Sequence, residues 1–142
     1  MDRKQLDRIH RVRTAQLNLV RAAEAEAHER FASEAALKGR IAQLAAGVAP
    51  QPSAADGVSF AAAALYRERL QQSALAAERR VADAEARVEQ AAAATRAARQ
   101  DQHAVEKLIE RDSAAEALKA LRALEAAPST SNLSRTIRHD PC

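Results

Sequence analysis

The sequence predicts an all-α fold, namely a long two-helix antiparallel coiled-coil hairpin with a disordered C-terminal tail. Three observations lead to this prediction. Alanine, glutamate, lysine, leucine and arginine supply 85 of the 142 residues, a composition typical of long helices. The three glycines and four prolines gather between residues 39 and 57 and beyond residue 127. Apolar residues recur in heptads in two stretches, one that precedes the first of these places and one that lies between the two.

Large apolar side chains are too few to fill a compact interior. Leucine, isoleucine, valine and phenylalanine total 26 residues, whereas alanine alone numbers 38. A packed α/β enzyme is therefore not expected. Simple disorder is not expected either, because the net charge is only +3 and the apolar residues keep a helical spacing.

Residues from about 2 to 46 are expected to form the first helix, which the single Gly39 does not end. We define its seam as the two rows of residues expected to face the partner helix. The first row holds Leu6, Arg13, Val20, Ala27, Glu34 and Ile41, and the second holds Ile9, Gln16, Ala23, Arg30, Leu37 and Leu44. Leu17, Leu19 and Phe31 fall outside these rows, so the apolar face is broader than a strict coiled-coil stripe.

Residues 47–58 are expected to form the connector. They contain Gly47, Pro50, Pro52 and Gly57, which disfavour helix and so separate the two helices. A short link between two long helices returns the chain alongside itself. The hairpin is therefore expected to be antiparallel.

Residues from about 59 to 127 are expected to form the second helix, with Ser59 or Asp56 as its N-cap. Its first seam row holds Phe60, Arg67, Ala74, Val81, Val88, Thr95, Gln102 and Ile109, and its second holds Ala63, Leu70, Ala77, Ala84, Ala91, Ala98 and Val105. The second row is nearly all alanine, which allows a partner helix to approach closely. Pro128 ends the helix, and the Ser/Thr-rich residues 128–142 are expected to form the disordered tail.

The two helices differ in length, at roughly 65 Å and 105 Å. If the middle of the connector sets the register, the numbers of facing residues sum to about 104, which places Leu6 opposite Ala98. Helix two then overhangs beyond about His103. The overhang carries the apolar residues Val105, Leu108, Ile109, Leu118, Leu121 and Leu124, which need something to bury them. Residues 1 to 21 hold six basic and two acidic side chains, so this end of the rod is basic.

Motifs for catalysis or cofactor binding are not found in the sequence. The four histidines lack the spacing of a helical metal site, and no glycine belongs to a phosphate-binding loop. Carboxylate pairs such as Glu106 and Glu110 lie on faces that read as solvated. We expect no enzyme activity, no cofactor and no metal.

Charge and hydropathy also argue against binding to nucleic acid and against insertion into a membrane. Eighteen of the 22 basic residues are arginine, but helix two is balanced in charge and only three aromatic residues are available for stacking, so nucleic-acid binding is not expected. The charged N-terminus and the lack of a long uncharged apolar run predict neither a secretory signal nor membrane insertion. Cys142 is the only cysteine, and a cytoplasmic location fits best.

Helix two resembles a known family. The segments 65–70 (LYRERL) and 104–111 (AVEKLIER), joined by a middle rich in alanine and glutamate, are similar to the flagellar export protein FliJ and its virulence counterpart YscO. These are small two-helix coiled-coil proteins of type III secretion systems. The resemblance also covers the overall length and the order of a short helix followed by a long one. Asp112 and Ser113 depart from it, because the basic run of the family usually continues there.

The resemblance implies a function as a stalk. Such a protein inserts into the hexameric ring of the export ATPase, activates it, escorts export chaperones and contacts the membrane protein of the export gate, at the periphery of the inner membrane. The ring-facing, partner-binding residues would be Arg3, Arg8, Arg11, Arg13, Leu108, Ile109, Arg111, Leu118 and Leu121. Flagellar and virulence systems both stay open, and the chain is expected to be a monomer or to self-associate weakly.

Two alternatives accompany this hypothesis. The chain could be a generic cytoplasmic coiled-coil scaffold or chaperone without an ATPase partner. Leu108 and Ile109 could then seal a homodimer seam instead of facing a ring.

Overall fold

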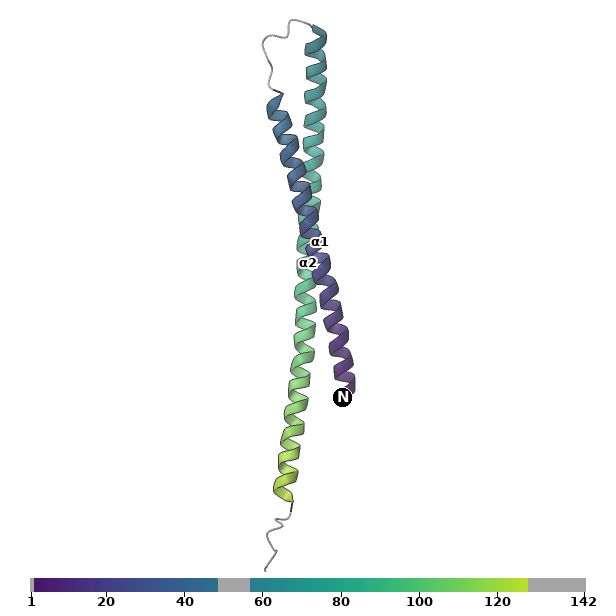
Figure 1. The fold of residues 1–142 in the computed structure, drawn as a ribbon, viewed down its shortest axis with the longest axis vertical. Helices are drawn as coiled ribbons and strands as arrows, with labels where there is room; N and C mark the ends of the chain where they lie inside the picture. Colours follow the sequence, from purple (N-terminus) through teal and green to yellow (C-terminus); the bar gives the residue numbers. More distant parts are fainter. Residues whose placement is uncertain (1, 49–56, 128–142) are drawn as a thin grey trace, which may run out of the picture.

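The computed structural model describes residues 2–48 and 57–127, which form two long helices. Helix α1 covers Arg3–Gly47 and helix α2 covers Gly57–Ala126. The two run antiparallel and side by side, and α1 crosses α2 obliquely (Figure 1). The predicted all-α hairpin is confirmed, and the predicted helix bounds of 2–46 and 59–127 agree within two residues. Most of the predicted connector and the whole predicted tail lie outside the described residues.

Local sequence explains how the helices begin and continue. Asp2 occupies the N-cap position of α1 in an extended conformation, and its backbone carbonyl accepts hydrogen bonds from the amides of Gln5 and Leu6 at 2.8 and 3.2 Å. Gly39 lies inside α1, and apart from the neighbouring backbone of its own helix no atom lies within 4 Å of the position that a Cβ would take there. The helix passes through it as predicted, because one glycine costs less than the surrounding alanine-rich turns contribute. Helix α2 begins at Gly57, two residues before the predicted cap Ser59.

The predicted seam of α2 is confirmed. Its buried residues Ala77, Ala84, Thr95 and Val105 all belong to the two predicted rows. The other residues of those rows are half-buried from Ala63 to Ile109, and only Phe60 at the start is exposed. Alanine at so many seam positions keeps the hairpin thin.

The predicted seam of α1 is half right. The row that begins at Leu6 faces α2, but the second row is displaced by one residue. Leu17 is 3% exposed, and Glu24 and Phe31 are half-buried one and two heptads later, whereas Ile9 and Leu37 are exposed. The face of α1 is broad, so two neighbouring rows are about equally apolar and apolar pattern alone does not choose between them. Large side chains at Leu17 and Phe31 suit the small residues across the seam.

The predicted register is wrong. The Thr95 hydroxyl donates to the Val20 carbonyl at 3.5 Å, and the Gln102 amide donates to the Thr14 hydroxyl at 3.3 Å. Facing residues such as 14 and 102 therefore sum to about 116 instead of 104, a shift of roughly 18 Å along the rod. A connector of this length can reach that far, so the packing of the seam decides the register. Helix α2 extends past α1 at both ends (Figure 1).

Candidate interaction surface

The shifted register shortens the predicted overhang. Val105 is buried, Ile109 is half-buried in the seam, and Glu106 and Glu116 both pair with side chains of α1. The prediction that α2 has no partner beyond His103 is therefore wrong. From residue 113 to residue 127 every side chain is exposed, so the lone segment begins about ten residues later than predicted.

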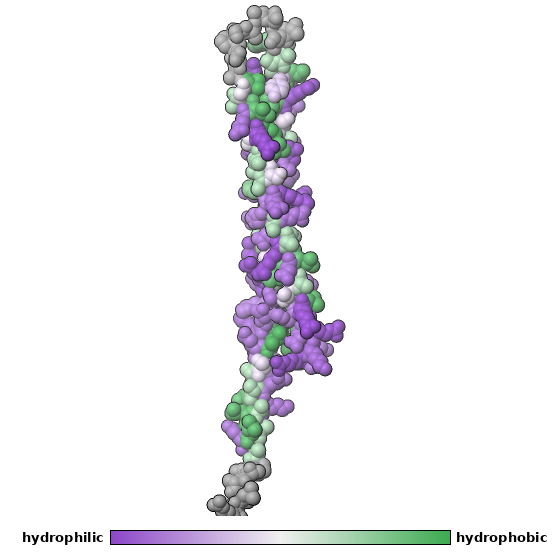
Figure 2. Space-filling model, viewed as in Figure 1, coloured by the Kyte–Doolittle hydropathy of each residue, from purple (hydrophilic) through white to green (hydrophobic). Residues whose placement is uncertain are grey.

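Leucines gather on this lone segment of α2. Leu118, Leu121 and Leu124 are all at least half exposed, and Leu108 is exposed beside the end of the seam. In Figure 2 apolar surface marks the lower end of the rod, below a band of polar surface. Leu108, Leu118 and Leu121 are therefore accessible to a partner, whereas the predicted contact residue Ile109 serves the hairpin itself.

The four predicted N-terminal arginines divide into two pairs. Arg3 contacts Glu116 at 3.0 Å and Arg13 contacts Asp101 at 2.9 Å, so these two guanidinium groups tie α1 to α2. Within residues 2–48 and 57–127, Arg8 and Arg11 have no acidic partner and are exposed. Arg111 is exposed on α2 and also lacks an ion pair in that part of the chain. Among the predicted contact residues, Arg8, Arg11 and Arg111 therefore offer basic charge to a partner.

A shallow groove runs along one side of the hairpin, and sequence analysis did not predict it. Three hollows of about 650, 130 and 310 Å³ follow one another along α1. The first is lined by Gln5, Arg8, Ile9, Val12, Arg13 and Gln16. The other two share residues with each other and are lined by α1 and α2 together: Ala23, Glu26, Ala27, Arg30, Ser33, Glu34, Arg80, Asp83, Ala84 and Arg87. We call these residues together the side groove.

The side groove explains the mistaken seam row. Four residues of the predicted second seam row line the groove instead, each one heptad after the previous one: Ile9, Gln16, Ala23 and Arg30. The signal in the sequence is the presence of one more apolar row on α1 than a two-helix contact can bury. The sequence shows that a surplus row exists but not which of the rows it is.

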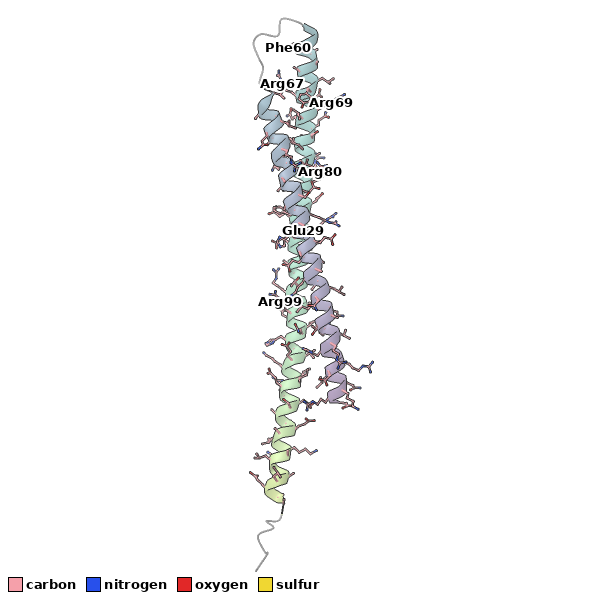
Figure 3. The ribbon with its side chains drawn as sticks, viewed as in Figure 1. Glu29, Phe60, Arg67, Arg69, Arg80 and Arg99 are labelled. Carbon is pink, nitrogen blue, oxygen red and sulfur yellow. The ribbon has the colours of Figure 1, made fainter. Side chains whose placement is uncertain are left out.

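Ion pairs occupy the part of the side groove that both helices line. Arg80 Nε lies 3.3 Å from Glu34, and Arg30 pairs with Glu26 on the preceding turn. Arg80 lies in the upper half of the rod, whereas Phe60 lies beyond the end of α1 (Figure 3). Arg87 lines the groove without an ion pair among the described residues. Exposed pairs of this kind contribute little stability.

Two histidines meet a single carboxylate near the basic end. His10 Nε2 lies 3.4 Å and His103 Nδ1 lies 3.6 Å from Glu106, so two of the histidines that looked scattered in sequence come together. No group of His, Cys, Asp and Glu side chains in the described ranges has the arrangement of a metal site. Neither described helix is long and apolar enough to cross a membrane.

Comparison with known proteins assigns no relative. No protein-family model, no curated protein and no solved structure matches this chain.

Proposed function

We propose that the chain is a non-enzymatic component of a type III protein export apparatus, acting as the stalk and activator of a hexameric export ATPase and as an escort for export chaperones. The proposal rests on the resemblance of residues 65–70 and 104–111 to the FliJ/YscO family together with the shape of the molecule. In this proposal the protein works at the export apparatus, at the periphery of the inner membrane.

One observation carries the proposal. A two-helix rod narrows to a single helix at its basic end, where α1 begins at Arg3 and α2 continues to Ala126. A ring pore accepts a rod one or two helices wide, about 10 Å per helix, but excludes a globular domain. Exposed leucines on the lone segment, and arginines beside it that have no ion pair among the described residues, supply apolar and charged contacts for the wall of such a pore.

The site residues have distinct roles in this proposal. Three leucines and three arginines contact the ATPase ring, namely Leu108, Leu118, Leu121, Arg8, Arg11 and Arg111. Arg3, Arg13 and Ile109 hold α1 against α2 and thereby position the contact residues. The remainder of the rod is left for export chaperones and the export gate.

The test is stimulation of the hexameric export ATPase from the same organism. Leu118→Asp should reduce stimulation at least about fivefold, because it places a charge in an apolar contact. Leu75→Asp is a matched control, since Leu75 is 52% exposed and Leu118 is 50% exposed on the same helix. Equal stimulation by the two variants would exclude this role for the lone segment.

A scaffold or chaperone without an ATPase partner is the second candidate. Apolar side chains are also exposed near the opposite end of α2, at Phe60, Leu65 and Tyr66, which a protein specialised at one end does not require. Sedimentation of the chain mixed with the ATPase separates the two candidates. A complex with the ring favours the stalk, and a chain that binds unfolded proteins but not the ring favours the chaperone.

A further inference from the structure

We propose that the side groove is the docking site for a third helix, an acidic amphipathic helix supplied by another protein. This inference does not depend on the proposed function, and its test uses no ATPase. Its starting point is that the three hollows share one side of the hairpin.

The groove has the length and continuity that a helix needs. Its lining on α1 runs from Gln5 to Glu34, roughly 45 Å at 1.5 Å per residue, which matches a helix of about four heptads. Gln16 and Ala23 lie one heptad apart, so the first and second hollows lie on the same side of α1, about two turns from each other. Farther along, Ala27 and Ala84 keep the floor low where the two helices meet.

Apolar anchors lie at one end of the groove. Ile9 and Val12 line the largest hollow and remain exposed, as does Leu19 two turns later. In the observed register Leu108 of α2 lies level with Ile9, because their numbers sum to 117 and facing pairs sum to about 116. Leucines of a third helix, spaced at i, i+3 and i+7, would cover Ile9 and Val12.

Charge identifies the kind of helix that fits. The side groove is lined by the five arginines Arg8, Arg13, Arg30, Arg80 and Arg87 against the three acids Glu26, Glu34 and Asp83. Arg13, Arg30 and Arg80 pair with Asp101, Glu26 and Glu34, and Asp83 has no ion pair within the described ranges. Neither does Arg8, in the first hollow, nor Arg87, in the other two. A helix with leucine on one face and glutamate beside it satisfies both, whereas a basic helix is repelled.

A designed peptide probes the site directly. The probe has four heptads with leucine at the two core positions and glutamate at the flanking positions, and a second peptide carries lysine at those flanks. We expect the full-length chain to bind the glutamate peptide at least about tenfold more tightly than the lysine peptide in fluorescence anisotropy. Binding should weaken as salt is raised, because screening removes the arginine contacts.

Two pairs of variants locate the binding. Val12→Asp should weaken binding of the glutamate peptide at least about tenfold, whereas Leu75→Asp should leave it unchanged, because Leu75 lies outside the groove. Arg8→Glu combined with Arg87→Glu should weaken it similarly, and Arg99→Glu, an arginine outside the groove, should not. Circular dichroism checks that all variants remain folded, which is expected because none of these residues is buried.

The proposal is overturned by any of three results. These are equal binding of the two peptides, full binding by the Arg8/Arg87 variant, and a groove that is covered by a second copy of the chain. The last appears as a dimer in sedimentation equilibrium that Val12→Asp dissociates.

Discussion

At the scale of single residues, side chains of the same type in α1 differ in whether they contact α2 or face solvent. Arg3 and Arg13 pair with acids of α2, whereas Arg8 and Arg11 have no acidic partner in the described chain. Leu17 is buried in the seam, whereas Leu19 points into solvent only two positions later. A helix turns by about 100° per residue, so a step of two places side chains on nearly opposite faces.

The two leucines provide a direct test of the seam. Leu17→Ala should lower the free energy of unfolding by about 2–4 kcal/mol, because it opens a cavity in a very thin core. Leu19→Ala should change it by less than about 0.5 kcal/mol. Urea denaturation followed by circular dichroism measures both, and similar losses would mean that α1 presents a different face to α2.

At the scale of elements, the register comes from matching side chains along the seam. Thr95, Gln102 and Glu106 reach Val20, Thr14 and His10, and each contact obeys the same sum of residue numbers to within about one. Alanine on α2 makes the seam narrow and smooth. Polar contacts of this kind select one register among several that apolar packing alone would allow.

Spin labels can measure that register. With Cys142→Ser as background, nitroxides at Val12→Cys and Ala104→Cys should lie close together, because 12 and 104 sum to 116, as do the facing residues 14 and 102. A pair at residues 12 and 93 should be separated by roughly 16 Å more along the rod. Double electron–electron resonance distinguishes the two pairs, and the reverse order would restore the register centred on the connector.

At the scale of the whole molecule, the rod has two proposed interaction surfaces besides the seam. The lone segment of α2 with its leucines points along the axis of the rod, and the side groove runs along its flank. The first fits a ring pore, and the second fits a third helix. The two surfaces share no residue, although Arg8 at the basic end belongs both to the side groove and to the proposed ring contacts.

Truncation separates structure from function at this scale. A chain that ends after Ala117 should melt within a few degrees of the full chain, because the side chains of residues 118–127 are all exposed. Under the proposed stalk function it should nevertheless fail to stimulate the export ATPase. A chain that ends after Gln102 also loses Val105 and Ile109 from the seam, which should cost several kcal/mol and lower the melting temperature clearly. Thermal melts by circular dichroism measure both chains.

Sequence by itself determined the helices and one of the two contacting faces. Alanine is abundant, and the helix-interrupting glycines and prolines gather at only two places, so the sequence predicts two long helices. The face of α2 was predictable because its rows of small and aliphatic residues keep one heptad frame from Ala63 to Ile109, with no competing apolar row. The paired and unpaired arginines, by contrast, could not be told apart, since their roles depend on which residues of α2 lie opposite them.

Tertiary structure decided which row of α1 meets α2, the register, and hence where the lone segment begins. Two rows of α1 are similarly apolar, so the choice depends on how Leu17 and Phe31 fit against small side chains across the seam. The register depends on contacts between residues some 75 to 96 positions apart in the chain. The local sequence pattern does not reveal such contacts. If one helix slides along the other by one heptad, the apolar pattern at the seam stays the same although every residue has a new partner.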